Sequence, residues 1–233
     1  MCGRFTLKTP ASDWVQQLFP GLTILDMPNL PPRYNIAPTQ SILTLTMPEP
    51  KSDLRACIMR WGLVPPWSAD LAIGNNMINA RGETVAEKPS FRKALVKRRC
   101  VIIADGYYEW LRTEKTKRPF WIHRQENQAF CMAGLWEANH KVSPKETLLT
   151  TTIITTPANQ VTSAVHDRMP VIFDTQDALR WLDPELEDGA EINSLIRAAP
   201  NDWWSLTEVN SHVNNARNEG AKCLEPVAAN NSL

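Results

Sequence analysis

Alternating apolar and polar residues dominate the middle of the chain. Residues 41–47 (SILTLTM) alternate as a half-buried strand does, and residues 54–61 (LRACIMRW) follow as the other half of a hairpin. Five further runs are rich in β-branched and aromatic residues and are separated by turn-forming segments. These runs cover residues 100–105, 107–112, 119–124, 129–137 and 148–156. The pattern predicts a strand-rich centre.

Helical spacing is confined to four short segments. In residues 12–19, Trp14 and Leu18 recur at the spacing of a helix, and Ser12 or Asp13 can cap its first turn. The other segments with a helical pattern are residues 89–98, 175–182 and 184–198. These lengths predict small helices at the periphery of a sheet.

Two segments between these elements are rich in proline. Residues 28–38 (PNLPPRYNIAP) and 62–70 (GLVPPWSAD) are expected to be loops, because proline lacks the N–H that helices and sheets need. Residues 207–227 carry many asparagines, and we expect a loop with a short strand there. We expect the last residues, 228–233, to be frayed.

Strands outnumber helices, and the regular strand–helix–strand alternation of a doubly wound fold is missing. We therefore expect an α+β fold with a mostly antiparallel, barrel-like or two-layered sheet and a few peripheral helices. The length of 233 residues fits one larger domain or two small ones. We expect a single domain over residues 1–233, ordered over about residues 2–227.

The charges of the chain cancel, with 25 basic and 25 acidic side chains. A neutral protein is not a polybasic binder, so any contact with nucleic acid must use a local patch. No apolar run approaches the roughly 20 residues that span a bilayer, and the first residues lack the pattern of a secretory signal. These features predict a cytoplasmic protein that does not contact membranes.

Five cysteines occur, and no pair has the CxxC spacing. The odd count and the spacing argue against a zinc ribbon and against a disulfide framework, so we expect no metal and no cofactor. Free cysteine is among the most buried residue types. Cys57, Cys100 and Cys131 are therefore expected to be small buried apolar residues.

The chain begins MCGRF, which places Cys2 directly after the initiator methionine. The initiator is usually removed when the second residue is small, and Cys2 then carries a free α-amine beside its thiol. This 1,2-aminothiol can perform chemistry that no internal cysteine can. Cys2 is therefore a candidate catalytic residue.

Three other polar side chains lie in or beside apolar runs: Asn79, Glu109 and His166. A carboxylate among aromatic residues is desolvated, which raises its pKa and suits proton transfer. A histidine next to charged residues can also shuttle protons near neutral pH. Each has a plainer interpretation. Asn79 can form a turn, Glu109 can be exposed on an edge strand, and His166 can be a hydrogen-bonded core residue.

Three arginines lie two positions after a candidate residue: Arg4 after Cys2, Arg81 after Asn79 and Arg168 after His166. A guanidinium group binds phosphate through its planar fork. Trp61 and Trp67 flank a rigid proline-containing loop. We expect Trp61 in the core and Trp67 exposed, where it could stack on an unpaired base.

Seven motifs occur in a fixed order along the chain: MCGRF, RYNIAP, WGLVPPW, INARGET, ADGYYEW, AVHDRMP and GAKCLEP. Together they resemble the SRAP family, which is named for SOS-response-associated peptidases and comprises abasic-site-processing proteins. The resemblance extends from Cys2 to about Val227, nearly the whole chain. It implies the SRAP fold.

The resemblance also implies roles for the candidate catalytic residues. Cys2 would link covalently to an abasic site in single-stranded DNA, as a thiazolidine formed by its amine and thiol. Asn79 would hold the Cys2 amine or the sugar hydroxyl. Glu109 would transfer protons during ring opening and imine formation, and His166 would protonate the sugar oxygen and assist closure or reversal of the link.

For DNA binding, the resemblance implies that Arg4, Arg81 and Arg168 hold phosphates beside the lesion and that Trp67 stacks on a base. This chain has Ser68 where some relatives carry a second tryptophan. It also lacks an arginine that some relatives place near residue 88, where Lys88 could substitute. These departures bear on the DNA contacts and not on the covalent chemistry.

The resemblance further implies a monomeric protein of the DNA damage response that shields abasic sites, with replication forks or single-strand/duplex junctions as further partners. It would be cytoplasmic and associated with the nucleoid when DNA is damaged. Removal of Met1 by the protein itself would fit the peptidase, hence hydrolase, in the family name. Crosslink reversal and a weak abasic-site lyase activity are also implied.

Three other classes of protein remain possible on the sequence alone. A class II glutamine amidotransferase also exposes a cysteine nucleophile after Met1, with the α-amine as its base. A non-catalytic single-strand DNA-binding module would need the arginines and Trp67 but not Cys2. A β-rich domain with an incidental terminal cysteine would need neither.

Overall fold

The computed structural model describes residues 2–114, 116–126 and 128–227. The tail expected to be frayed, residues 228–233, lies outside the described residues. Within these ranges, no helix combines the length and the apolar composition needed to cross a bilayer.

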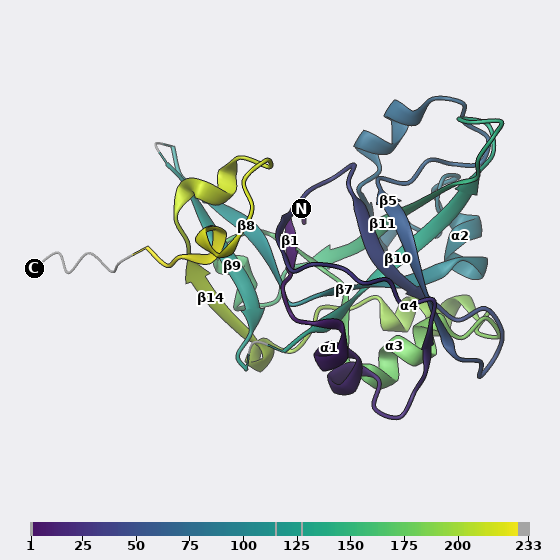
Figure 1. Cartoon of the computed structure of the whole chain (residues 1–233), viewed down its shortest axis with the longest axis horizontal. Coiled ribbons are helices and arrows are strands. Elements are labelled where there is room, and N and C mark those ends of the chain that lie inside the picture. The colour runs from purple at the N-terminus through teal and green to yellow at the C-terminus, as the bar shows by residue number, and fades with distance from the viewer. Residues whose placement is uncertain (1, 115, 127, 228–233) are drawn as a thin grey trace, which may run out of the picture.

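Five long strands close into a barrel (Figure 1). They are β4 (Ser41–Thr46), β5 (Leu54–Trp61), β7 (Arg99–Ala104), β10 (Phe130–Asn139) and β11 (Leu148–Pro157). Antiparallel pairs join β5 to β4, β4 to β7, β7 to β10 and β10 to β11. A short parallel pairing of β11 with β5 completes the ring. Five of the seven strands expected from the sequence therefore form this barrel, in agreement with the barrel-like alternative of the expected sheet, and the other two, residues 107–112 and 119–124, lie in a second sheet.

A second sheet of five strands packs beside the barrel, in the order β14-β9-β8-β1-β3. Its strands are β14 (Trp204–Glu208), β9 (Lys117–Arg124), β8 (Gly106–Arg112), β1 (Phe5–Leu7) and β3 (Arg33–Ile36). The prediction of a loop over residues 28–38 is wrong for β3. Residues 33–36 contain no proline, so their N–H groups are available for pairing with β1.

Four short strands extend the barrel sheet: β2 (Ile24–Leu25), β6 (Asn79–Arg81), β12 (Arg168–Pro170) and β13 (Ile172–Phe173). β6 runs parallel to β11, and β12 runs antiparallel to it. Strand β11 therefore brings residue 79 and residue 168 to one region, although 88 residues separate them in the sequence.

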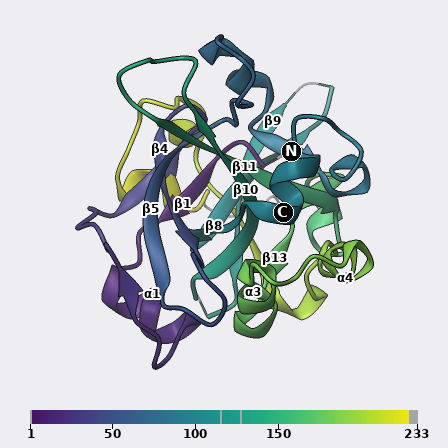
Figure 2. The same cartoon turned by 90° about the vertical axis from the view of Figure 1, so that its right-hand side faces the viewer.

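The helices are short and lie at the periphery. They are α1 (Ala11–Leu18), α2 (Arg92–Lys97), α3 (Thr175–Leu182) and α4 (Gly189–Leu195). In Figure 1, α1, α3 and α4 lie below the strands and α2 lies at the right, and Figure 2 shows the same low position of α1, α3 and α4. Short 3₁₀ helices are η1 (Leu71–Asn76), η2 (Gly82–Thr84), η3 (Thr162–Ala164), η4 (Asn201–Trp203), η5 (Ser211–Asn214) and η6 (Ala221–Leu224). The strand-rich α+β fold with a few peripheral helices is confirmed.

Two helices are shorter than the predicted segments. In residues 184–198 the helix begins only after Asp188, whose carboxylate accepts hydrogen bonds from the N–H groups of Ala190 and Glu191. In residues 89–98 the helix begins at Arg92, after a turn in which the N–H of Phe91 bonds to the carbonyl of Lys88. The cap of α1 is also different, since Pro10 precedes it without a side-chain hydrogen bond.

A buried arginine ties two helices to the barrel. Arg99, in β7, is 6% exposed, and its guanidinium donates only to backbone carbonyls. These carbonyls belong to Leu95, Val96, Trp181, Asp183 and Leu186, around the C-terminal ends of α2 and α3. A cation at a helix C-terminus satisfies carbonyls that have no partner within the helix.

Strand β1 is fixed to the rest of the fold by a buried carboxylate. Asp105, between β7 and β8, accepts hydrogen bonds from the Thr6 hydroxyl at 2.6 Å and from the N–H groups of Lys8 and Thr9 at 2.7 Å each. The Thr9 hydroxyl adds a bond of 2.8 Å. On the barrel side, the Phe5 ring packs edge-on against Trp61, with ring centroids 5.3 Å apart. These contacts fix the chain immediately after Cys2.

We expect Asp105→Ala to lower the free energy of unfolding by about 3 kcal/mol, because it leaves several buried donors without an acceptor. Urea denaturation measures this loss. The control Asp53→Ala removes an exposed carboxylate and is expected to change stability by less than about 0.5 kcal/mol. Equal effects of the two substitutions would contradict the role given to Asp105.

Candidate active site

Cys2 lies at the start of the chain but inside the protein, with no exposed surface. It precedes β1, which is paired on one side with β8 and on the other with β3. Burial raises the pKa of the Cys2 thiol far above its usual value, and the charge of Glu109 raises it further. A hydrogen bond from the backbone N–H of Arg4 acts in the opposite direction.

Asn79 contacts the backbone of Cys2. Its Nδ2 donates to the Cys2 carbonyl oxygen at 2.8 Å, from the first position of β6. Its Oδ1 is buried and accepts no hydrogen bond from any described residue. A buried carbonyl oxygen without a donor is costly, so this atom marks a position suited to a donor group beside Cys2.

Glu109 is 4% exposed. It lies on β8, the middle strand of the second sheet, which is flanked by β9 and β1. This burial excludes the alternative of an exposed glutamate on an edge strand. Burial raises the pKa of the Glu109 carboxyl, and the positive charge that His166 can carry acts in the opposite direction. The environment is the one expected for a proton-transferring carboxyl group.

His166 faces Glu109 across the site. Its Nε2 lies 4.0 Å from Oε2 of Glu109, and its side chain is 29% exposed. Its Nδ1 lies 3.0 Å from the backbone N–H of Arg168, from which it accepts a hydrogen bond when the neutral ring carries its proton on Nε2. In the protonated ring, Nδ1 can donate to Asp167, whose Oδ1 lies 2.8 Å away.

The structure thus brings Cys2, Asn79, Glu109 and His166 together from four separate parts of the sequence. It adds Tyr107, which sequence reasoning missed. Tyr107 is fully buried, and its pKa is raised well above the usual value by burial and by the nearby Cys2 and Glu109. Its place beside Glu109 could have been predicted, because residues two apart on a strand point to the same face, as Tyr107 and Glu109 do on β8.

Arg168 is held by an acidic partner that sequence reasoning also missed. Its guanidinium pairs with both carboxylate oxygens of Glu83, and its Nη2 donates to the Thr155 carbonyl at 2.7 Å. The Arg168 side chain is 12% exposed. The hydrogen bonds from Arg168 lower the pKa of Glu83. Arg168 is therefore a fixed, largely buried cation at the edge of the site.

Arg4 is also tied into the fold. Its Nη1 donates to Asn35 Oδ1 at 2.7 Å and to the Val213 carbonyl at 2.9 Å, and the guanidinium lies 5.7 Å from the centre of the Trp110 ring. Partial burial lowers its pKa. Arg4 therefore connects the strand after Cys2 to the C-terminal segment.

Arg81 and Trp67 are exposed, as their proposed contacts with DNA require. Trp67 is 55% exposed, whereas Trp61 is fully buried, as predicted for both. Arg81 is exposed at the end of β6, two residues after Asn79. Lys88 is exposed as well, but Ser68 is buried and bonds to Asp70.

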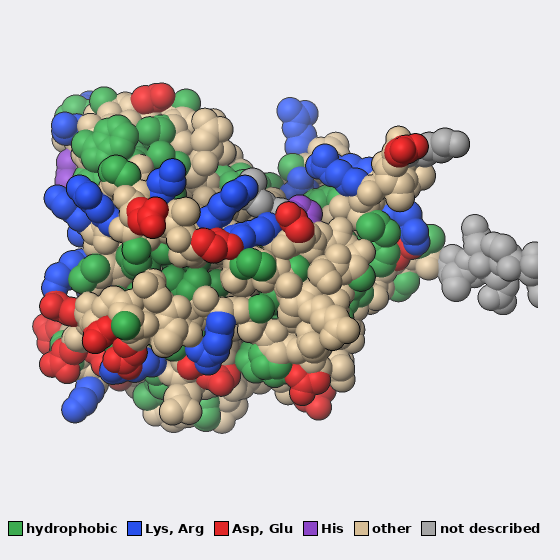
Figure 3. Space-filling view, turned by 180° about the vertical axis from the view of Figure 1, so that it is seen from behind, with side chains coloured by type: hydrophobic (Ala, Val, Ile, Leu, Met, Phe, Trp, Pro, Cys, Tyr) green, Lys and Arg blue, Asp and Glu red, His purple; other side chains and the backbone are tan. Residues whose placement is uncertain are grey.

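The face seen in Figure 3 carries basic side chains interspersed with acidic ones, in keeping with the neutral net charge. On this face, no large area is purely basic. Any contact of this face with phosphates would therefore depend on individual basic side chains and not on a continuous basic surface.

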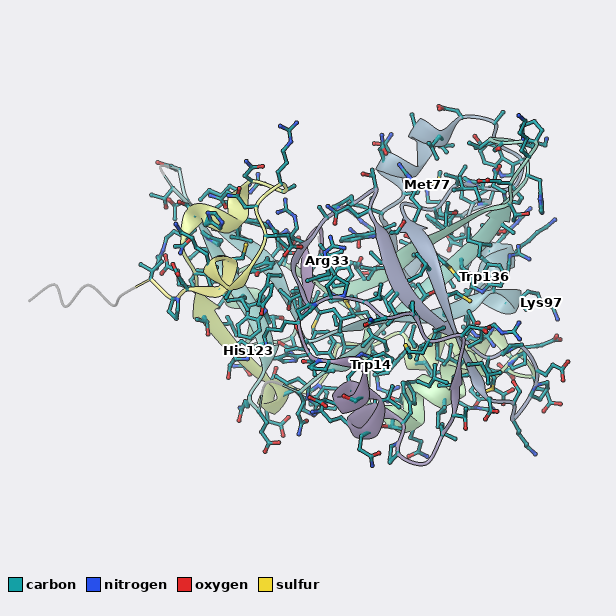
Figure 4. The ribbon with its side chains drawn as sticks, in the orientation of Figure 1. Trp14, Arg33, Met77, Lys97, His123 and Trp136 are labelled. Carbon is teal, nitrogen blue, oxygen red and sulfur yellow. The ribbon has the colours of Figure 1, made fainter. Side chains whose placement is uncertain are left out.

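His123 and the remaining cysteines lie apart from this site. His123, labelled in Figure 4, is on β9 of the second sheet. Its ring stacks on Trp121, with ring centroids 3.9 Å apart. Cys100 and Cys131 are fully buried, whereas Cys57 is partly exposed. The expectation of full burial is therefore confirmed for two of these three cysteines.

Comparison with known proteins gives consistent matches over most of the chain. The family model of SRAP, the SOS response associated peptidase, matches residues 1–216. The abasic site processing protein YoqW of Bacillus subtilis is 42% identical over 97% of this chain and 99% of its own length. The abasic site processing protein HMCES of Gallus gallus is 33% identical over 72% of this chain and 56% of its own length.

A solved structure shares the fold. The crystal structure of a protein from Bacteroides thetaiotaomicron superposes with a TM-score of 0.84 and 25% sequence identity, over 97% of this chain and 100% of that one. The match of the family model to most of the chain, together with the arrangement around Cys2, leads to one assignment. This protein belongs to the SRAP family.

Proposed function

We propose that this protein recognises abasic sites in single-stranded DNA and captures them covalently through Cys2. Membership of the SRAP family and similarity to proteins named for abasic site processing support the substrate class. The single observation that carries the covalent step is the placement of Cys2. It is buried beside the Asn79 amide, with Glu109 and His166 across the site.

The proposed reaction uses both nucleophiles of Cys2 after Met1 has been removed, whether by an aminopeptidase or by the protein itself. The α-amine adds to the aldehyde carbon of the ring-opened deoxyribose, and loss of water gives an imine. The sulfur then attacks the same carbon, and the nitrogen takes up a proton as the five-membered thiazolidine closes. The tether makes this ring closure effectively intramolecular, which favours it strongly.

Asn79 has a specific role in this scheme. Its Nδ2 already holds the Cys2 carbonyl oxygen, while its Oδ1 is a buried acceptor that receives no hydrogen bond from the described residues. A free α-amine on Cys2 is a donor on the same residue. Asn79 would therefore orient the amine so that its lone pair faces the aldehyde.

Glu109 and His166 would move the protons. Loss of water from the first adduct needs a proton on the leaving oxygen, and closure of the sugar ring or reversal of the link needs its return. A carboxyl group with a raised pKa beside an imidazole is suited to both directions. The same imine would permit a weak β-elimination, which is the lyase activity expected from the sequence.

The DNA strand would be held by Arg4, Arg81 and Arg168 and by stacking on Trp67. Arg81 and Trp67 are exposed, whereas Arg168 is paired with Glu83 and would have to share its guanidinium between that carboxylate and a phosphate. We further propose a monomer that acts in the cytoplasm and nucleoid during the DNA damage response, including at forks and single-strand/duplex junctions.

The covalent step predicts an adduct between the protein and an abasic single-stranded oligonucleotide that survives denaturation. Mass spectrometry of the intact protein should show the oligonucleotide bound only to chains that lack Met1. Cys2→Ala, or insertion of one glycine between Met1 and Cys2, should abolish the adduct. Cys57→Ala is the matched control and should react as the natural protein does. An adduct that persists after the insertion would contradict the proposal.

The raised pKa of Glu109 predicts the pH dependence of capture. As the pH falls through this pKa, the carboxylate becomes protonated and can no longer accept a proton, so the rate should decline at a higher pH than the usual range of glutamate. Glu109→Gln should remove this acidic limb and slow capture by about 100-fold or more. Stopped-time assays at values between about pH 4 and 8 measure the rate of capture for both proteins. An unchanged profile would remove Glu109 from the mechanism.

Phosphate contacts predict a dependence on salt. The logarithm of the affinity for single-stranded DNA should decrease linearly with the logarithm of the salt concentration, and Arg81→Ala should reduce this slope by about 0.7. The control is Arg55→Ala, which removes an exposed arginine paired with Asp26. It should leave the slope unchanged. Equal slopes for all three proteins would show that Arg81 does not contact phosphate.

A further inference from the structure

The loop that carries Trp67 is unusually well anchored for an exposed loop. Residues 65–68 form a tight turn in which the N–H of Ser68 bonds to the Pro65 carbonyl at 3.0 Å. Pro66 occupies the second position of this turn, where its fixed φ is favourable. Trp67 occupies the third position and is 55% exposed.

One buried side chain holds both ends of this turn. Asn139, the last residue of β10, has no exposed surface. Its Nδ2 donates to the Pro65 carbonyl at 2.7 Å and to the Ser68 carbonyl at 2.8 Å. Its Oδ1 accepts from the N–H groups of Lys141 and Val142 at 2.8 and 2.9 Å. All four hydrogen-bonding positions of the amide are therefore used.

Further bonds support the approach to the turn. The N–H of Val64 donates to the Thr150 hydroxyl of β11 at 2.9 Å. The N–H of Leu63 donates to the carbonyl of Met77, which is labelled in Figure 4. The turn is thus connected to two barrel strands, although Trp67 itself projects from it. The side chain at position 67 is presented on a rigid support.

We propose that Asn139 is a positioning residue that holds the Trp67 turn in the orientation needed to stack an unpaired base of the DNA strand. This inference rests on the proposed function, in particular on stacking by Trp67. A pre-ordered platform lowers the entropy lost on binding. The amide is required chemically, because its two donors face two carbonyl oxygens. An aspartate of the same shape would place negative charge against those oxygens.

The role proposed for Asn139 affects the binding of DNA and not the chemical step of capture. Asn139 lies outside the cluster around Cys2, so its loss should weaken capture at low DNA concentration and leave the rate at saturation unchanged. Stacking on an aromatic side chain contributes about 1–3 kcal/mol per base, which corresponds to roughly 5- to 150-fold in affinity. Trp67→Ala should raise the half-saturating DNA concentration within this range.

The test is a double-mutant cycle on the natural chain, with capture of an abasic oligonucleotide measured over a range of DNA concentrations. Asn139→Asp should raise the half-saturating concentration by about fivefold or more, with a saturating rate within about twofold of the natural protein. In the Trp67→Ala background the same substitution should have no further effect. Ile103→Val, a buried change in β7, is the control for loss of stability alone and should leave both quantities unchanged.

Hydrogen exchange of residues 62–70 provides a second readout, since Asn139→Asp should increase exchange there without melting the barrel. If that variant does not fold, Thr150→Val removes only the acceptor of the Val64 N–H and should loosen the same loop. An unchanged half-saturating concentration for the loosened loop, or effects that multiply with Trp67→Ala, would overturn the role of Asn139. If Trp67→Ala itself has no effect, stacking and the role of Asn139 both fail, while Cys2-dependent capture can still stand.

Discussion

The burial of Cys2 is the constraint on which the site depends. A chain terminus is normally exposed and mobile, yet here the second residue has no exposed surface. It stays inside because the strand that follows it is fixed from both sides. The carboxylate of Asp105 accepts hydrogen bonds from hydroxyl and backbone N–H groups in and just after β1, and Phe5 packs against Trp61 of the barrel. Contacts elsewhere in the fold therefore hold Cys2 in its buried position.

Burial also sets the electrostatics of the site. Removal from water raises the pKa values of the Cys2 thiol, the Tyr107 hydroxyl and the Glu109 carboxyl together. A negative charge on Glu109 raises the pKa values of Cys2 and Tyr107 further. A positive charge close to Cys2 and Glu109 acts in the opposite direction and lowers the pKa values of their side chains. In the proposed reaction, the cationic imine would be such a charge and would favour ionisation of the buried thiol.

Much of this arrangement could be predicted from the sequence, and the reasons are physical. The alternation in residues 41–61 marks a hairpin because the side chains of a strand alternate between two faces, and β4 and β5 form it. Asn79, Glu109 and His166 stood out because polar residues in apolar runs need partners, and Cys2 stood out because removal of Met1 would leave an amine beside its thiol. Contacts between distant residues gave no such signal: Glu83 with Arg168, and Asn139 with the Trp67 turn. Closure of the barrel by a short parallel pairing of β11 with β5 was equally invisible.

The central claim is that one carbon of the abasic sugar becomes bonded to both the nitrogen and the sulfur of Cys2. The most direct measurement is carbon NMR of the complex formed with single-stranded DNA that carries ¹³C at the aldehyde carbon of the abasic site. The account predicts a tetrahedral carbon attached to nitrogen and sulfur, in a complex that forms only after Met1 has been removed. A trigonal imine carbon as the stable product, or a carbon that remains a free hemiacetal in the bound complex, would contradict it.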